Sequence, residues 1–173
     1  MTLMPRIDKI DRRTDVVFLL FLYAEEIAGV TKLQKLLFLI EQETDFFQAY
    51  KQDIAFKFAP YKMGPFSEHV YEELEFLLSL GAIESEPLDD SSTDLTDTDL
   101  SEKRFTITRK GEKIASELES QLKPEYQDEL RELVREYNSL PLEELLKYVY
   151  TEYPDYAAES EILDELGIEV IPS

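Results

Sequence analysis

Apart from the carboxylates, the residues that could do acid–base or nucleophilic chemistry are few. The 173 residues contain one histidine, His69, and no cysteine. A histidine base needs a nucleophile held beside it, and no nucleophile motif surrounds His69. We therefore expect a surface or interface histidine and no catalytic residue. Because 38 acidic residues always place some pair of carboxylates close together, a small hydrolase is kept as the third hypothesis.

Metal and cofactor sites are not indicated either. Without cysteine there are no disulfides, thiolate zinc sites or iron–sulfur clusters, and one histidine excludes a multi-histidine site. The acidic segment 94–101 offers oxygen ligands, but an EF-hand would need glycine at Glu102 and glutamate at Thr108. The five glycines stand singly, so no phosphate-binding loop is present. We expect no metal and no cofactor.

Protein recognition is the chemistry that segment 60–71 favours. Its aromatic and apolar side chains beside a lysine are typical of an interface hot spot. The alternative is that Tyr61 and Phe66 only pack the turn onto the first helix, and that Gly64 and Pro65 only set its geometry. The candidate partner-binding residues are Tyr61, Lys62, Met63, Pro65, Phe66 and Tyr71.

Apolar periodicity predicts two helices before this segment. The first has a stripe at Val16, Leu20, Tyr23, Ala24 and Ile27, with Thr14 as its cap. The second begins after Gly29 with a capping box at 31–34, in which Gln34 serves its own helix. We expect Leu33, Leu36, Leu37 and Ile40 to be buried and Lys32 and Lys35 to project elsewhere.

The next elements are shorter. Residues 45–53 form a turn or short helix, residues 54–58 alternate as a strand, and residues 60–66 form a rigid turn. Ser67 caps a third helix, which Gly81 ends in a left-handed conformation.

Strands are predicted at 82–84 and 105–108, joined by an acidic loop. Three helices followed by a β-hairpin is the order of a winged helix-turn-helix, so we expect an α+β fold. The core would cover residues 1–122, with the acidic wing loop at 85–103.

A helical C-terminal extension, residues 123–173, packs on the same domain in this prediction. A fourth helix runs from Arg109 to before Pro124. Two more follow, separated by residues 138–141, with Pro141 in the first turn of the second, and a last short helix covers 157–166.

The net charge of −20 disfavours nucleic acid and anionic lipid as partners. The expected recognition helix, 67–80, has four glutamates and no basic residue, whereas such a helix normally presents basic or amide side chains to DNA. A winged-helix transcriptional regulator is therefore the alternative hypothesis. Its candidate DNA-binding residues are Lys32, Lys35, Lys103, Arg104, Arg109 and Lys110.

The apolar run 16–24 follows basic residues and so imitates a signal peptide. It is too short to span a bilayer and no cleavage site closes it. We expect a cytoplasmic protein without a membrane partner. Whether it forms a homodimer is left open.

Four segments of the sequence resemble those of a known family. The sequence KLQKLL at 32–37 is followed by PYKMGPFS at 60–67 and by V-Y-x-x-L at 70–74. In this order and spacing they resemble the Panacea (SocA-like) antitoxin-domain family and its uncharacterised prokaryotic relatives. The motif Y-x-x-Y-P-x-Y at 150–156 is similar to a tail motif of those relatives. The resemblance implies a non-enzymatic protein that binds and neutralises a partner protein, typically a toxin encoded beside it.

Overall fold

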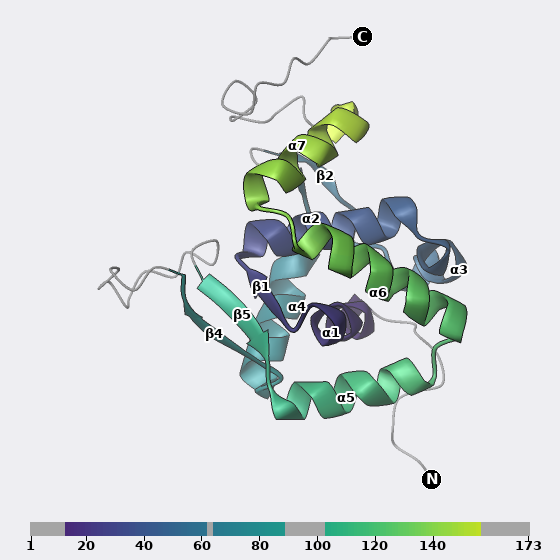
Figure 1. The fold of residues 1–173 in the computed structure, drawn as a ribbon, viewed down its shortest axis with the longest axis vertical. Coiled ribbons are helices and arrows are strands. Elements are labelled where there is room, and N and C mark those ends of the chain that lie inside the picture. Colours follow the sequence, from purple (N-terminus) through teal and green to yellow (C-terminus); the bar gives the residue numbers. More distant parts are fainter. Residues whose placement is uncertain (1–12, 62–63, 89–102, 157–173) are drawn as a thin grey trace.

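The computed structural model describes residues 13–61, 64–88 and 103–156 (Figure 1). They form a mostly helical α+β fold with two small antiparallel sheets. In chain order the elements are α1 (Arg13–Ala24), β1 (Glu26–Ala28), α2 (Val30–Glu43), α3 (Asp45–Ile54), β2 (Ala59–Tyr61), β3 (Gly64–Phe66), α4 (Glu68–Leu80), β4 (Ile83–Pro87), β5 (Lys103–Ile107), α5 (Arg109–Ser120), α6 (Pro124–Asn138), α7 (Leu142–Glu152) and the 3-10 helix η2 (Pro154–Tyr156).

The core is built around α1. Its six consecutive apolar residues 16–21 are all buried, because α4, α5 and α6 pack against different sides of the helix. Figure 1 looks nearly along α1 and shows it between these helices. A helix that is apolar all round has to be enclosed in this way, and this explains why the segment imitates a signal peptide. None of the helices in the described ranges is both long and apolar enough to cross a membrane.

The first helix ends earlier than its apolar stripe predicts. The prediction that it continues to Ile27 is wrong, because Glu25 has a left-handed backbone (φ 66°) and Ile27 lies in strand β1. The proposed cap Thr14 is also wrong, since Thr14 lies inside α1 and its hydroxyl donates to the Glu73 carboxylate. An apolar residue at 27 is compatible with both the helix and the strand spacing. Residue 27 adopts the strand because it pairs with β5.

The larger sheet has the strand order β1-β5-β4, with both pairs antiparallel. Ile27 lies opposite Phe105, and Ile83 lies opposite Ile107, so the central strand β5 joins the two outer ones. The predicted strands at 82–84 and 105–108 are confirmed within one to three residues, while Thr108 caps α5 instead of extending its strand. The sequence did not predict β1, since three residues are too few to show alternation.

The helix boundaries of α4 agree with the prediction. Ser67 is its N-cap and accepts a hydrogen bond from the His69 N–H. Gly81 has a left-handed backbone (φ 79°), and its N–H donates to carbonyls of the last turn. The capping box at 31–34 is wrong, because α2 begins at Val30 after Gly29 and has no side-chain cap.

The segment between α3 and α4 differs most from the prediction. Residues 45–54 form α3, but residues 55–58 are irregular, and the predicted strand at 54–58 is wrong. Lys57 has a positive φ of 60°, which an extended strand does not allow. The predicted rigid turn is a short hairpin, β2 paired with β3, and residues 62–63 lie outside the described residues.

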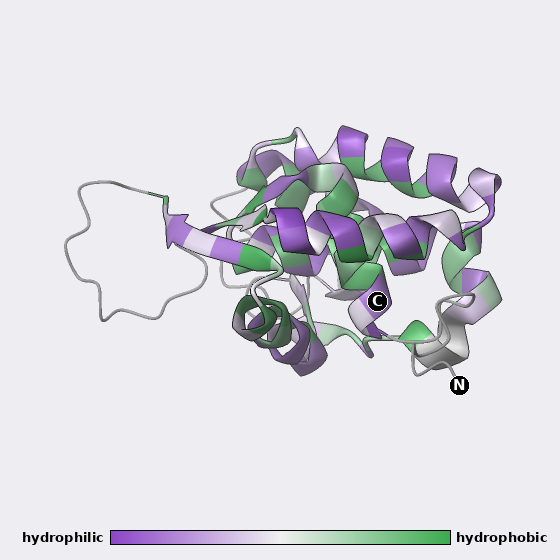
Figure 2. Cartoon of the chain, turned by 90° about the horizontal axis from the view of Figure 1, so that it is seen from below, coloured by the Kyte–Doolittle hydropathy of each residue, from purple (hydrophilic) through white to green (hydrophobic). Residues whose placement is uncertain are grey.

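The C-terminal helices cover α1 and α2. Contacts of α6 with α1 and α2, and of α7 with α2, join the extension to the preceding elements. Figure 2 shows the hydrophilic faces of the outer helices turned away from the apolar interior. Pro141 is the N-cap of α7, one position before its predicted place in the first turn. The predicted loop at 89–102 and helix at 157–166 lie outside the described residues.

Gly111 allows α5 to approach the sheet, and its replacement tests this contact. A Cβ at residue 111 would overlap the carbonyl oxygen of Ala82 and lie 2.9 Å from Cγ1 of Ile107. We expect Gly111→Ala to lower the free energy of unfolding by about 1–3 kcal/mol, although alanine has the higher helix propensity. Urea denaturation measures the difference. The control Ser116→Ala, at an exposed position of α5, should stay within about 0.5 kcal/mol of wild type.

Candidate functional site

A pocket of about 170 Å³ lies where the start of α2 meets the β2–β3 hairpin and α4. It therefore brings together the two motifs that carry the family resemblance. The α2 motif supplies one side, and the hairpin and the first helical turns of α4 supply the other. The lining residues are Val30, Thr31, Gln34, Lys35, Tyr61, Gly64, Phe66 and Tyr71.

Three aromatic side chains form a row beside the pocket. The ring centroids of Tyr61 and Phe66 are 5.0 Å apart, and those of Phe66 and Tyr71 are 5.6 Å apart. Tyr61 is 48% exposed, while Phe66 and Tyr71 are half-buried. The structure thus brings together three of the six predicted partner-binding residues. Pro65 is buried and does not line the pocket, and Lys62 and Met63 are outside the described residues.

Lys35 lies in the interior at the pocket. Its side chain is 2% exposed, and its Nζ donates a hydrogen bond of 3.0 Å to the carbonyl oxygen of Pro65. Burial lowers the pKa of Lys35 to about 7, because the ammonium loses its hydration. The expectation that this lysine projects from the helix surface is therefore wrong.

Lys32 is also buried, at 8% exposure, and its Nζ donates to the backbone carbonyl of Asn138 at 3.0 Å. Desolvation lowers its pKa as well. The bond joins α2 to the end of α6. Both lysines are mostly buried and bonded to backbone carbonyls, so neither projects freely from the surface of α2 as a phosphate contact normally does, which opposes their assignment as DNA-contacting residues.

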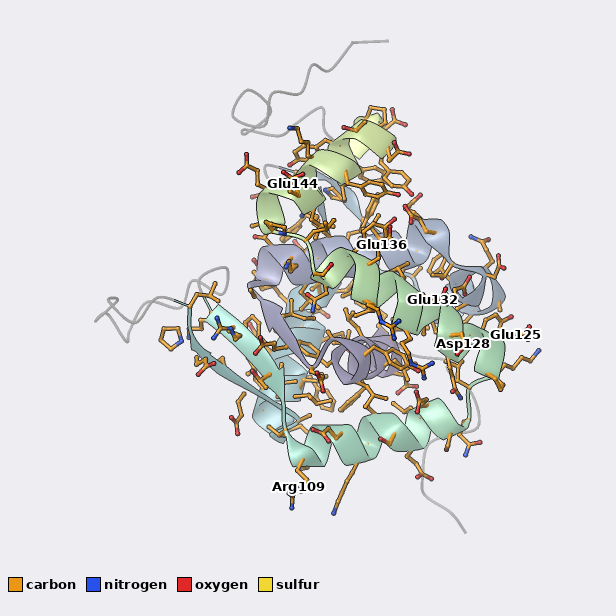
Figure 3. The ribbon with its side chains drawn as sticks, in the orientation of Figure 1. Arg109, Glu125, Asp128, Glu132, Glu136 and Glu144 are labelled. Atoms are coloured by element: carbon orange, nitrogen blue, oxygen red, sulfur yellow. The ribbon has the colours of Figure 1, made fainter. Side chains whose placement is uncertain are left out.

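The other four basic candidates lie on β5 and at the start of α5. Arg104 pairs with Glu86 across the sheet at 3.4 Å, and Lys103 is half-buried. Arg109 and Lys110 are exposed. Figure 3 shows Arg109 apart from the outward-pointing carboxylates of α6 and α7. The labelled carboxylates are Glu125, Asp128, Glu132, Glu136 and Glu144.

Gln34 holds the hairpin side of the pocket in place. Its amide nitrogen donates to the Ser67 carbonyl and its amide oxygen accepts from the Ser67 N–H, both at 3.0 Å. The Ser67 hydroxyl in turn donates to the carbonyl of Phe56. One buried side chain therefore fixes the end of the hairpin and the start of α4. The sequence suggested a capping role for Gln34 because the residue stands three positions after a threonine.

Gly64 is required by the close approach of three elements. Its φ is +91°, and a Cβ would lie 2.8 Å from Cε1 of Tyr150 and 3.2 Å from Cε of Lys35. Any side chain at this position would collide with Tyr150 and crowd Lys35. The glycine therefore lets both side chains pack directly against the hairpin backbone.

The tail motif at 150–156 packs on the same helix, α2. Tyr150 is buried beside Gly64, and the Tyr153 hydroxyl donates to Glu43 at the end of α2. Tyr137 and Tyr148 donate to the same carboxylate, at 2.7 and 2.6 Å. Burial and these contacts raise the pKa of Tyr148 to about 12. Sequence reasoning did not identify this cluster, because its tyrosines lie more than 90 residues from Glu43.

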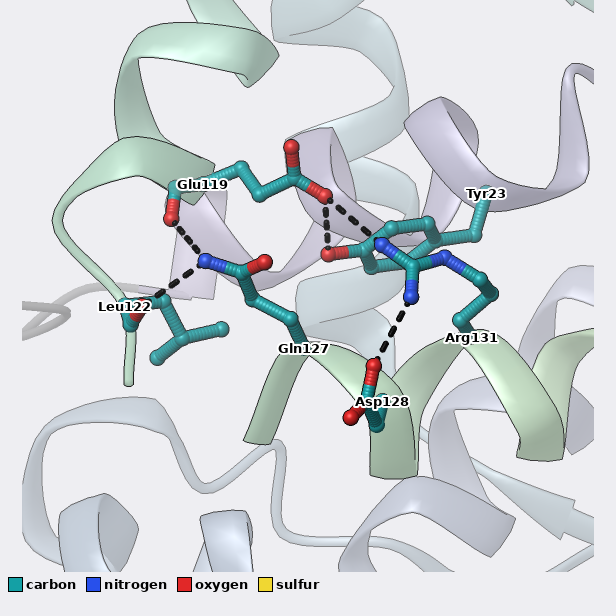
Figure 4. Close-up of polar contacts among 6 residues, drawn as sticks. All are labelled: Tyr23, Glu119, Leu122, Gln127, Asp128 and Arg131. Carbon is teal, nitrogen blue, oxygen red and sulfur yellow. Dashed lines mark hydrogen bonds and ion pairs between the residues drawn. The ribbon is translucent and has the colours of Figure 1, made fainter. Parts of the chain in front are cut away.

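A second polar cluster joins α1, α5 and α6 (Figure 4). The Tyr23 hydroxyl donates to Glu119 at 2.6 Å, and Arg131 lies 3.4 Å from the same carboxylate. Gln127 donates to the carbonyls of Glu119 and Leu122, both at 2.9 Å. Burial and the contact with Glu119 raise the pKa of Tyr23. Since these groups bond one another, the cluster fixes the turn between α5 and α6.

Within residues 13–61, 64–88 and 103–156, no group of three or more histidine or carboxylate side chains could hold a metal ion. His69 Nδ1 lies 3.4 Å from the exposed carboxylate of Glu72, on the same helix.

No protein-family model, curated protein or solved structure gives a significant match to this chain.

The contribution of Gln34 can be tested with a matched pair of glutamines on α2. Gln34→Ala leaves the N–H and carbonyl of Ser67 buried without these partners, so we expect a loss of about 2–4 kcal/mol in the free energy of unfolding. Gln42→Ala, at an exposed position of the same helix, should change it by less than about 0.5 kcal/mol. Equal effects in urea denaturation would disprove the proposed constraint.

The lowered pKa of Lys35 predicts a specific dependence of stability on pH. Between its folded pKa of about 7 and its ordinary value of 10.5, the unfolded chain binds a proton that the folded chain does not. The contribution of Lys35 to the free energy of unfolding therefore increases as the pH rises through this interval, by at most about 1.4 kcal/mol per pH unit. Lys35→Met lacks the titrating group.

The measurement is urea denaturation of both proteins between about pH 6.5 and about pH 9.5. We expect wild type to gain stability relative to Lys35→Met as the pH rises, because the other titrating groups are common to both. Parallel profiles would contradict a buried, deprotonating lysine.

Proposed function

We propose that this chain is a non-enzymatic, cytoplasmic protein-binding module that neutralises a partner protein, as an antitoxin does. The stacked row of Tyr61, Phe66 and Tyr71 at the mouth of a pocket is the observation that carries the proposal. Aromatic side chains already held by their neighbours lose little rotamer freedom on binding, which favours them as anchors. The family resemblance at 32–37 and 60–74 points to the same surface.

The core topology supports a winged-helix interpretation of the fold. Helix α1 leads through β1 into α2, α4 then leads into β4 and β5, and β5 pairs with both other strands. Helix α3 and the β2–β3 hairpin stand between α2 and α4 as an insertion. We propose that the insertion, which forms part of the pocket, adapts this core to protein binding.

A DNA-binding regulator is the second candidate, favoured by that topology and by exposed Arg109 and Lys110. The charge of α4 opposes it, because Glu68, Glu72 and Glu75 are exposed on the helix that would enter the major groove. These carboxylates would repel the DNA phosphates.

Two aromatic residues with matched exposure test the partner surface. Tyr61 and Phe76 are 48% and 47% exposed, but only Tyr61 lines the pocket. The tagged chain is purified from its host with nuclease, the stoichiometric protein partner is identified, and its affinity is measured. We expect Tyr61→Ala to weaken binding by about 30-fold or more, as loss of a hot spot does, and Phe76→Ala to leave it unchanged.

Discrete DNA fragments without a protein partner would overturn this proposal in favour of the regulator. In that case binding should fall steeply with salt and be weakened by Arg109→Gln and Lys110→Gln. A protein partner bound equally well by Tyr61→Ala would show that the interface lies elsewhere.

A further inference from the structure

When protonated, Lys35 carries a positive charge that no nearby carboxylate balances within the described part of the chain. Its single hydrogen-bond partner there is the carbonyl of Pro65, and no carboxylate lies within 4.0 Å of its Nζ among those residues. A lysine ammonium has three N–H donors. Burying such a cation is unfavourable unless a counter-charge or further acceptors accompany it. The pocket beside Lys35 is the place where an acceptor could enter.

The start of α2 adds positive potential to the same place. In a helix, long side chains run back toward the N-terminus, so the Lys35 side chain extends toward the first turn. Val30 and Thr31 of that turn line the pocket. Gly29 provides no side-chain cap, and the first turn contains no acidic residue. The first N–H groups of a helix attract an anion when no side chain satisfies them.

The rest of the pocket is mostly apolar, and its volume is that of one aromatic ring. Its volume of about 170 Å³ is close to the roughly 150 Å³ of a cavity that holds benzene. Tyr61, Phe66 and Tyr71 provide aromatic surface, and Lys35 also lines the pocket, where it packs directly against the backbone of Gly64. A ligand that fits has an apolar group of this size and one polar end.

We propose that this pocket binds a small organic acid, whose carboxylate meets the Lys35 ammonium and whose ring-sized apolar group lies against Tyr61, Phe66 and Tyr71. A single negative charge matches the single cation. A phosphate would bring a second charge into a mostly apolar pocket of a molecule with a net charge of −20, and both effects oppose its binding. The site does not depend on the proposed partner, because the chain alone forms it.

The charge at the site is set by Lys35. Among the described residues, the other titratable side chains that line or adjoin the pocket are the phenols of Tyr61, Tyr71 and Tyr150, from β2, α4 and α7. At pH 6.5, which lies below the pKa of about 7, more than half of the Lys35 side chains are in the ammonium form. Measurements at this pH therefore test an ammonium–carboxylate contact.

Isothermal titration of the full chain with benzoate, at about pH 6.5, tests the proposal, with benzamide as the neutral probe of nearly equal size. We expect saturable benzoate binding, and binding of benzamide weaker by about tenfold or more, the loss of one charge-assisted contact. Lys35→Met keeps an apolar chain of similar length and should lose affinity for benzoate by the same factor. Lys32→Met removes the other buried α2 lysine, which does not line this pocket, and should bind as wild type does.

A measurement on wild type alone guards against variants that do not fold. In NMR titrations, benzoate should shift the amide signals of Thr31, Gly64 and Tyr71 with one common dissociation constant. A dissociation constant of about 20 mM corresponds to a binding free energy of about −2.3 kcal/mol. If benzoate binding does not saturate up to about 20 mM, the proposal is overturned. Equal binding of benzamide, unchanged binding by folded Lys35→Met, or shifts confined to other residues would also overturn it.

Discussion

The side-chain amide of Gln34 pairs with both backbone groups of Ser67, and the candidate site depends on this constraint. Ser67 ends the hairpin and caps α4, so one glutamine on α2 sets the position of both elements. Lys35, the next residue, donates a hydrogen bond to the carbonyl of Pro65, two residues before Ser67. Together the two side chains hold β3 against α2 with three hydrogen bonds, and they position Phe66 between Tyr61 and Tyr71.

Polar residues on a core helix are unfavourable unless each finds a partner. Helix α2 contains Lys32, Gln34 and Lys35 among its buried apolar residues, and all three bond backbone groups of other elements. At its other end Glu43 accepts hydrogen bonds from three tyrosines of α6, α7 and the segment after α7. The polar residues of α2 thus determine where the hairpin and the C-terminal helices dock, while its leucines provide the buried area.

The same arrangement links the proposed functions to the stability of the fold. The aromatic row is exposed at Tyr61 and anchored at Phe66 and Tyr71, so a partner would meet a surface that is already ordered. Beneath it lies a cation whose burial is unfavourable, and this unfavourable term is what an anionic ligand would relieve. A protein partner above and a small acid below would therefore use one site through different chemistry.

The sequence by itself determined the elements whose signals are local. Ser67 and Gly81 mark the ends of α4 because caps depend on neighbouring backbone groups, and the apolar stripes locate most helices. The tertiary structure alone decided that Ile27 joins a strand, that Lys57 interrupts one, and that Lys32 and Lys35 are buried. The pairing of Ile27 and the burial of the two lysines depend on partners 30 to 106 residues away, such as Pro65 and Asn138, and spacing along one helix does not encode such contacts.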